Sequence, residues 1–170
     1  MELPEFCKKR KTMQNTLITF AVLMSVQVLA QESNTHFSHT VETTASPAAI
    51  WRIWTDVPNW KSWDDGLKSA ELNGPFAPGT AGTLIPDKGP RLKFLLTEVV
   101  DGQSYTFKTN LPLGALYVKR YLDVRDGKTV FTHEVWFTGL TKGMFGRALG
   151  RNYRRILPDV MTKIKTLAES

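Results

Sequence analysis

The pattern of hydrophobic and polar residues along the chain predicts mostly short strands. Between residues 36 and 43 the two kinds alternate, with Phe37 and Val41 on one side, which is the two-residue period of a half-buried strand. Further strands are expected over residues 67–72 and 80–86, because the turn-rich stretch NGPFAPG separates two short apolar runs there.

Two short helices are expected between the first and second strands. Ser46 is a suitable N-cap and Pro47 fits the first helical position, and apolar residues follow at helical spacing to about Thr55. Pro58 interrupts this helix. The stretch NWKSWDDG then predicts a second short helical turn that ends before the next strand.

Two β-hairpins are predicted by Asp-Gly pairs, which are the strongest short-range signal for a tight turn between strands. Asp101-Gly102 and Asp126-Gly127 each stand between two apolar-patterned runs. In the first hairpin large residues such as Phe94 mark one face. Leu95 and Val99 leave its other face mixed, so the register of this hairpin stays open.

The turn at Asp126-Gly127 determines which residues of the second hairpin face one another. One face then carries an apolar stripe with a single polar pair, and the other carries an aromatic pair and an oppositely charged pair. This chemical agreement supports the register. The expected pairs are Leu116 with Phe137, Val118 with Val135, Arg120 with His133 and Leu122 with Phe131 on the first face, and Tyr117 with Trp136 and Lys119 with Glu134 on the second.

A long amphipathic helix is expected from about Lys142 to Ala168, because apolar residues recur there at steps of three and four. Pro158 is expected to kink it, since proline removes a backbone donor and crowds the preceding turn. The element order is β-α-α-β-β-β-β-β-β-α in one domain. The apolar side of this helix carries Phe145, Leu149, Tyr153, Ile156, Val160, Ile164 and Leu167.

The first 30 residues differ from the rest of the chain. The basic cluster KKRK at positions 8–11 precedes a mostly apolar run from Leu17 to Ala30, which is short for a membrane span. We expect residues 1–30 to be a secretory signal cleaved after Ala30, leaving residues 31–170 as a periplasmic or secreted domain. The alternative is an uncleaved membrane anchor, although Ser25 and Gln27 weaken the segment as a permanent span.

Composition adds limits to this picture. The 170 residues are 42% hydrophobic and 22% charged, as in one globular domain. The only cysteine, Cys7, lies in the segment expected to be removed, so a disulfide and thiolate catalysis are excluded from the mature domain. The net charge of +6 falls to +4 without residues 1–30, which permits contact with anionic surfaces but requires no nucleic acid.

The element order and three stretches of sequence resemble the SRPBCC superfamily of START-like helix-grip domains, and within it the polyketide cyclase/dehydrase and lipid-transport group. The resemblance covers residues 36–169 and depends on Ser46-Pro47, on Trp60-x-x-Trp63-Asp64 and on the loop from Gly74-Pro75-Phe76 to Gly79. It implies an α+β helix-grip fold, in which a curved antiparallel sheet of about seven strands wraps around the long C-terminal helix, with two short helices after the first strand.

The resemblance also implies a cavity for a hydrophobic small molecule between the sheet and the terminal helix. It indicates the fold better than an activity, because members bind lipids, hormones, quinones and polyketides, and many catalyse nothing. The expected ligand-binding residues are Trp60, Trp63, Phe94, Leu96, Tyr105, Phe107, Val118, Arg120, Leu122, Phe131, His133, Val135, Leu149 and Tyr153.

Four tryptophans and two adjacent aspartates stand close together between residues 50 and 66. In the family such tryptophans seat the two short helices against the sheet, so a packing role is the simplest interpretation, with ligand contact by Trp60 or Trp63 as the alternative. Asp64 and Asp65 are expected to end the second helical turn and to cap backbone donors. Adjacent side chains usually point apart, which is poor geometry for an acid/base pair.

Arg120 and His133 are the candidate chemical groups, because they are the only polar pair on the apolar strand face. Arg120 could anchor an anionic head group, while His133 could donate a hydrogen bond or move a proton. The guanidinium is expected to lower the pKa of His133. Alternatively, both side chains lie near the cavity mouth or bond backbone carbonyls.

Several kinds of site are not supported by the sequence. His36, His39 and His133 are the only histidines and show no zinc-ligand spacing, so no metal is expected. No Gly-x-Ser-x-Gly elbow is present, and GTAG lacks the following helix that a phosphate site needs. We therefore expect no cofactor.

The terminal helix is basic, and the loop GLTKGMF before it carries apolar residues between glycines. These features favour either transient contact with an anionic membrane surface or an ordinary solvated helix face. The loop could be a lid or a membrane-touching tip. The basic residues are Arg147, Arg151, Arg154, Arg155, Lys163 and Lys165.

The leading functional prediction is an exported, monomeric protein that binds a lipid or another hydrophobic small molecule without transforming it. The alternative is a cyclase/dehydrase-like enzyme in which Arg120 and His133, with Tyr105 or Tyr121, orient a polyketide-like substrate and move protons. A protein-interaction module with a filled interior is a third possibility.

Overall fold

The computed structural model describes residues 33–170, which belong to one compact unit. The expected signal segment, residues 1–30, lies outside the described residues. No helix within residues 33–170 is long and apolar enough to cross a membrane.

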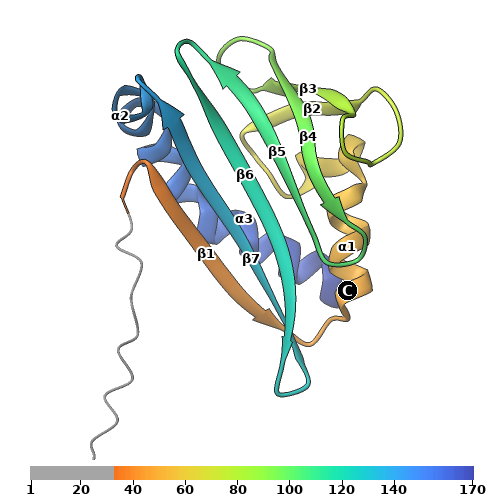
Figure 1. The fold of residues 1–170 in the computed structure, drawn as a ribbon. Helices are drawn as coiled ribbons and strands as arrows, with labels where there is room; N and C mark the ends of the chain where they lie inside the picture. The colour runs from red at the N-terminus through yellow and green to blue at the C-terminus, as the bar shows by residue number, and fades with distance from the viewer. Residues whose placement is uncertain (1–32) are drawn as a thin grey trace, which may run out of the picture. The chain divides into compact units, whose positions relative to one another are not determined.

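Seven antiparallel strands form one sheet in the order β1-β7-β6-β5-β4-β3-β2, and the C-terminal helix α3 crosses one face of it (Figure 1). This arrangement confirms the predicted α+β helix-grip fold. The strands are β1 His36–Thr43, β2 Leu67–Leu72, β3 Ala81–Pro86, β4 Leu92–Val100, β5 Ser104–Leu111, β6 Gly114–Arg125 and β7 Lys128–Gly139. The helices are α1 Pro47–Thr55, the 3₁₀ helix η1 Val57–Ser62, α2 Lys142–Phe145, the π-helix η2 Gly146–Gly150 and α3 Arg151–Glu169.

The first short helix, α1, has the predicted bounds, whereas η1 begins two residues before the predicted stretch NWKSWDDG and ends within it. The Ser46 hydroxyl accepts a hydrogen bond from the Ala49 amide at 3.2 Å, and Pro47 occupies the first helical position of α1. Pro58 then lies in the first turn of η1, where its missing N–H costs no hydrogen bond.

The second hairpin has the predicted register. Arg120 is paired with His133, and the other five expected pairs of β6 and β7 are also present. The turn residues Asp126 and Gly127 have φ angles of 51° and 76°, the left-handed values that a two-residue hairpin turn requires. A single Asp-Gly pair therefore determines which side chains of the two longest strands face α3.

A β-bulge explains the mixed pattern of the first hairpin. The pairing of β4 with β5 shifts between Leu96 and Glu98, so one extra residue enters β4 there. Phe94 and Leu96 are buried before the bulge, and Val99 lies opposite Tyr105 after it. Since a shift of one residue reverses the alternation of side chains, Val99 also packs on the core.

The C-terminal helical run differs from the single helix, kinked at Pro158, that the sequence predicts. It consists of α2, the π-helix η2 and α3, and α3 continues through Pro158. Gly146 and Gly150 lie against the chain just before β1. A β-carbon at Gly150 would be only 2.0 Å from the Asn34 carbonyl oxygen, so this approach requires glycine.

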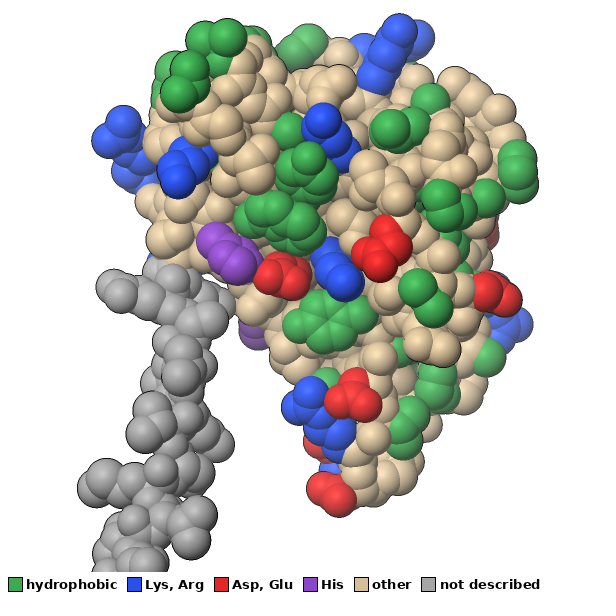
Figure 2. Space-filling model, viewed as in Figure 1, with side chains coloured by type: hydrophobic (Ala, Val, Ile, Leu, Met, Phe, Trp, Pro, Cys, Tyr) green, Lys and Arg blue, Asp and Glu red, His purple; other side chains and the backbone are tan. Residues whose placement is uncertain are grey.

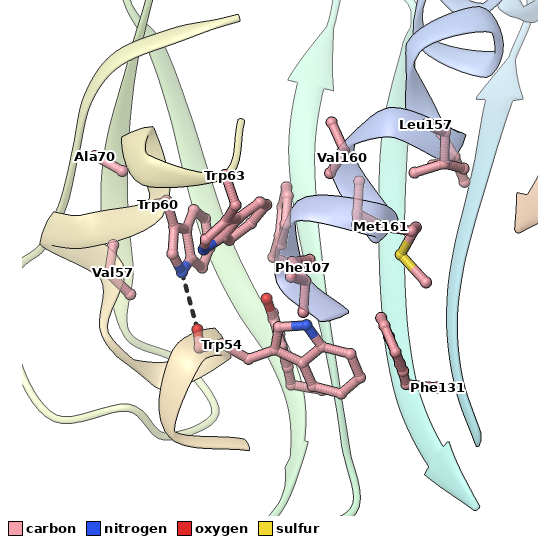
Figure 3. Close-up of a cluster of buried hydrophobic side chains, with 14 of the residues drawn as sticks. Trp54, Val57, Trp60, Trp63, Ala70, Phe107, Phe131, Leu157, Val160 and Met161 are labelled. Atoms are coloured by element: carbon pink, nitrogen blue, oxygen red, sulfur yellow. Dashed lines mark hydrogen bonds between the residues drawn. The ribbon is translucent and has the colours of Figure 1, made fainter. Parts of the chain in front are cut away.

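Three tryptophans form the centre of the core, where α1 and η1 meet the sheet (Figure 3). Trp54, Trp60 and Trp63 are fully buried, and the Trp60 indole N–H donates to the Trp54 carbonyl oxygen at 2.9 Å. Trp60 also stacks on Phe94 and Phe107. The packing interpretation of these tryptophans agrees with this arrangement, which fills one end of the space between sheet and helix.

Candidate functional site

A cavity of about 210 Å³ lies between α3 and the concave face of the sheet. Ligand cavities commonly measure roughly 300–1,000 Å³, so this one suits a small ligand or the end of a larger one. Apolar side chains make up most of its wall. The lining residues are Trp60, Asp64, Gly66, Leu67, Leu84, Leu92, Phe107, Thr109, Leu116, Val118, Arg120, Leu149, Asn152, Tyr153 and Ile156.

A second, more polar hollow of about 390 Å³ adjoins this cavity. The two share Gly66, Asn152 and Ile156 as lining residues. The wall of the second hollow also carries Asp65 and Asp159, which makes it acidic. A ligand that fills the inner cavity can therefore extend toward solvent between the start of β2 and α3.

Arg120 is the principal polar residue of the cavity wall, and only 2% of it is exposed. Its Nε donates to His133 Nδ1 at 3.2 Å, and its Nη1 donates to the Tyr105 hydroxyl. No carboxylate among the described residues forms an ion pair with it. The guanidinium is thus a buried positive charge without a salt bridge, although the charge of Asp64 on the same wall is close enough to interact with it.

Four aromatic rings lie close to the guanidinium. Its central carbon lies 4.8 Å from the ring centre of Trp63 and 5.1 Å from that of Trp60, with Tyr105 and Phe107 slightly farther away. Cation–π attraction of this kind is worth about 1–2 kcal/mol when water is excluded. The tryptophan-rich helical segment therefore partly offsets the cost of burying Arg120.

His133 links Arg120 to the terminal helix. Because its Nδ1 accepts from Arg120, its Nε2 carries the proton and donates to the Tyr153 hydroxyl at 2.9 Å. Burial, with the Arg120 charge as a second cause, lowers the pKa of His133 well below its ordinary value. His133 is therefore neutral at neutral pH.

The direction of these hydrogen bonds determines what Tyr153 can do. Its oxygen accepts from His133, so its own hydroxyl hydrogen remains available, and Tyr153 lines the cavity. Burial raises the pKa of Tyr153 and that of Tyr105. Both phenols thus keep their protons, and Tyr153 can donate a hydrogen bond to a ligand.

Asp64 and Asp65 have separate partners and form no acid/base pair. The Asp64 carboxylate accepts a hydrogen bond from the Gly66 amide at 3.0 Å, which is the expected capping role, whereas Asp65 pairs with Lys163. Asp64 also lines the cavity. Burial raises its pKa, although the nearby Arg120 charge opposes this effect.

Comparison with known proteins agrees with this architecture. The family described as polyketide cyclase / dehydrase and lipid transport has a model that matches residues 34–169. The protein belongs to this family. The predicted SRPBCC resemblance is therefore confirmed over the whole described domain, while a search of curated proteins finds no match.

Solved structures share the fold of this family member at low sequence identity. Protein MLL2253 from Mesorhizobium loti has a TM-score of 0.64 at 16% identity, and the match covers 79% of this chain and 96% of that one. Ara h 8.0201 has a TM-score of 0.63 at 14% identity, and the match covers 79% of this chain and 97% of that one. Norcoclaurine synthase from Thalictrum flavum was solved with dopamine and hydroxybenzaldehyde. It has a TM-score of 0.59 at 17% identity, and the match covers 78% of this chain and 85% of that one.

At these identities the comparisons show the fold alone. The matched region takes up nearly all of the MLL2253 and Ara h 8.0201 chains. These are proteins that consist of little besides this domain. The unit Gln31–Ser170 is compact and contains one hydrophobic core, as an independently folding domain does.

The structure places the expected ligand-binding residues in two groups. Some lie on the cavity wall: Trp60, Phe107, Val118, Arg120, Leu149 and Tyr153. The others lie outside this wall. Leu122 is partly buried at the edge of the core. The fully buried ones are Trp63, Phe94, Leu96, Tyr105, Phe131, His133 and Val135. Tyr121 follows Arg120 in β6 and therefore points to the opposite face of the sheet.

Several wall residues were not among the expected ligand-binding residues. Leu116 and Ile156 could have been found, because each lies on an apolar stripe that the sequence shows. Asp64 and Thr109 also face the cavity, and the Thr109 hydroxyl has no hydrogen-bond partner among the described residues. Asn152 gave no signal in the sequence pattern.

Proposed function

We propose that this member of the polyketide cyclase / dehydrase and lipid transport family binds a lipid or another hydrophobic small molecule that carries one acidic or carbonyl group. The apolar part of the ligand occupies the cavity, and its polar group contacts Arg120 and Tyr153. The observation that carries this proposal is a buried guanidinium on the wall of an apolar cavity that forms no salt bridge with any carboxylate of residues 33–170.

Energetic reasoning supports an acceptor on the ligand. A buried charge is costly unless it is paired and hydrogen-bonded, and aromatic rings recover only part of that cost. A carboxylate or carbonyl oxygen would supply the missing acceptor for Arg120. It could also use the free hydroxyl hydrogen of Tyr153 and the unpartnered hydroxyl of Thr109.

The size of the cavity supports a particular pose. A volume of about 210 Å³ holds a small aromatic or branched molecule, or one end of a longer chain. A longer lipid would leave the cavity through the adjoining hollow beside Gly66 and Ile156. We infer that the polar end enters first, because Arg120 lies on the inner wall.

We also propose that the protein acts outside the cytoplasm after cleavage near Ala30. The support is the basic cluster at positions 8–11 followed by the apolar run from Leu17 to Ala30. The mass of the protein recovered from a bacterial periplasm tests this. Protein of the mass of residues 31–170 is expected, and full-length protein in the membrane fraction would indicate a retained anchor.

A cyclase/dehydrase-like activity is the second candidate function, and one observation favours it. Tyr153 offers a proton to the cavity, and Asp64, whose pKa is raised, offers a carboxylate on the same wall. A hydrogen-bond donor and a base on one wall could act on a bound carbonyl compound. Turnover that is lost in Asp64→Asn while ligand binding remains would establish this activity.

Native mass spectrometry of the purified protein tests the proposed function. We expect a bound hydrophobic compound with an acidic or carbonyl group, recovered by solvent extraction from the wild type and lost from Arg120→Gln. Arg125→Gln is the matched control, because Arg125 is exposed at the far end of β6. Equal retention by the Arg120 and Arg125 variants would contradict the role of Arg120.

A further inference from the structure

Four large hydrophobic side chains are exposed together at one end of the molecule, and we call them the apolar tip. Leu113 is 72% exposed, Leu140 88%, Met144 52% and Leu149 45%. Hydrogen bonds join the two turns that carry the first pair, from the Leu140 amide to the Leu113 carbonyl at 3.0 Å and from the Thr141 hydroxyl to the Pro112 carbonyl at 2.6 Å. Met144 follows in α2 and Leu149 in η2.

The backbone at Leu113 indicates that its exposure is not incidental. Leu113 has a φ of 56°, a left-handed conformation that a bulky residue rarely adopts and that usually selects glycine or asparagine. The turn therefore carries strain in order to present a leucine to solvent. Neither core packing nor turn propensity explains that choice, which is a reason to look for function.

Basic residues lie on α2, η2 and α3 beside the apolar tip. Lys142, Arg147, Arg151, Arg154 and Arg155 are all exposed, and no acidic residue occurs between Glu134 and Asp159. None of these five forms an ion pair with any described residue. Figure 2 shows hydrophobic side chains gathered at the corner of the molecule over α2, with Lys and Arg side chains beside them.

We propose that the apolar tip inserts into the headgroup region of an anionic lipid bilayer, while the surrounding basic residues contact the phosphates. Exposed apolar side chains within a cationic border are the combination that binds such a surface. A nucleic acid would match the charge but not the leucines and methionine. A neutral protein groove would match the apolar residues but not the charge.

Two features connect this surface to the rest of the molecule. Leu149 belongs both to the apolar tip and to the cavity wall, so a bilayer at the tip would lie beside the cavity. Asn34, near the start of the described domain, lies against Gly146 and Gly150. The chain therefore enters the domain at this end. The docking proposal does not depend on the proposed ligand, because it can be tested with an empty cavity.

Flotation with lipid vesicles tests the proposal on residues 31–170, the compact unit that contains the hydrophobic core and lacks the apolar N-terminal run. We expect binding to vesicles of phosphatidylcholine mixed with phosphatidylglycerol and little binding to phosphatidylcholine alone. Removing three charges in K142Q/R147Q/R151Q should weaken binding roughly a hundredfold. Removing apolar contact in L140S/M144S should also abolish flotation, even at low salt.

Matched variants keep the test specific. R52Q/K61Q/K68Q removes the same number of exposed charges from α1, η1 and β2, and V100S/V124S removes two exposed apolar side chains from the hairpins. Both should bind like the wild type. If R52Q/K61Q/K68Q lost as much vesicle binding as K142Q/R147Q/R151Q, net charge alone would explain the binding and the proposal would be overturned. Failure of the wild type to float with the vesicles would overturn it as well. A dimer that dissociates in L140S/M144S would overturn it too, by making the apolar tip a self-interface.

Discussion

At the scale of the residue, the chain of hydrogen bonds from Arg120 through His133 to Tyr153 is the feature that distinguishes this cavity from a plain apolar pocket. The charge of Arg120 fixes the tautomer of His133, and that tautomer fixes the direction in which Tyr153 can donate. Each group thus acts on the ligand partly through its neighbour. His133 itself is a positioning residue, since it lies behind the cavity wall.

The buried His133 makes stability depend on pH. Because folding lowers its pKa below 6.5, its contribution to stability is present above pH 6.5 and is lost as the pH falls toward the folded-state value. The free energy of unfolding of the wild type should therefore fall relative to that of His133→Gln on acidification. The slope should approach about 1.4 kcal/mol per pH unit.

Urea denaturation at a series of pH values measures this difference. His39→Gln is the control, because His39 is the paired residue on β1 but is not fully buried. It should follow the wild type. The range from about pH 7 to about pH 5 brackets the ordinary histidine pKa of about 6.5. If the free energies of unfolding of the wild type and of His133→Gln change in parallel over this range, His133 is not held neutral.

At the scale of the element, close approach decides the shape of the C-terminal helical run. Gly146 and Gly150 allow η2 to lie against the chain before β1, and the run departs from regular α-helix at this point. Regular α-helix resumes at Arg151, and α3 then covers the sheet. The position of Tyr153 over the cavity depends on this contact, since it lies only one turn beyond Gly150.

Substitution of Gly150 tests that contact. Gly150→Ala places a β-carbon 2.0 Å from the Asn34 carbonyl oxygen, so the helix or strand must shift. We expect a loss of about 1–3 kcal/mol in the free energy of unfolding. Gly143→Ala is the matched control, since its β-carbon meets nothing within 4 Å, and it should be neutral or slightly stabilising. Equal thermal midpoints for the two variants would contradict the close approach.

The sequence predicted most elements because their signals were local. Ser46-Pro47 located α1, and the Asp126-Gly127 turn located every pair of the second hairpin, including Arg120 with His133. The bulge after Leu96 could not be predicted, because an extra residue in one strand is defined only by its partner strand. The π-helix depends likewise on a contact with Asn34, far away in the sequence.

The candidate site was predictable in part for the same reason. Arg120 and His133 could be identified because a polar pair on an apolar stripe is visible in the sequence. The hydrogen bond to Tyr153 and the position of Asp64 on the cavity wall join distant segments. Trp60 lines the cavity, whereas Trp63 does not. This difference is determined by side-chain packing, which the periodicity of the sequence does not encode.

At the scale of the whole molecule, the interior is divided between packing and binding. Tryptophans of α1 and η1 fill one part of it, and a small cavity with Trp60 and Arg120 on its wall lies directly beside them. Arg120 forms no salt bridge with any described carboxylate, so its replacement by an apolar residue of similar size should leave the protein folded, at the cost of the hydrogen bonds to His133 and Tyr105. The central claim is that Arg120 is retained for a ligand and not for the fold.

The most direct measurement compares the binding of decanoic acid and methyl decanoate, followed by the fluorescence of the tryptophans beside Arg120. The wild type should bind the acid about ten- to a hundredfold more tightly than the ester, because only the carboxylate pairs with the guanidinium. Arg120→Met should lose this preference while it still unfolds in one cooperative transition. Equal binding of acid and ester by the wild type, or an unfolded Arg120→Met variant, would contradict the account.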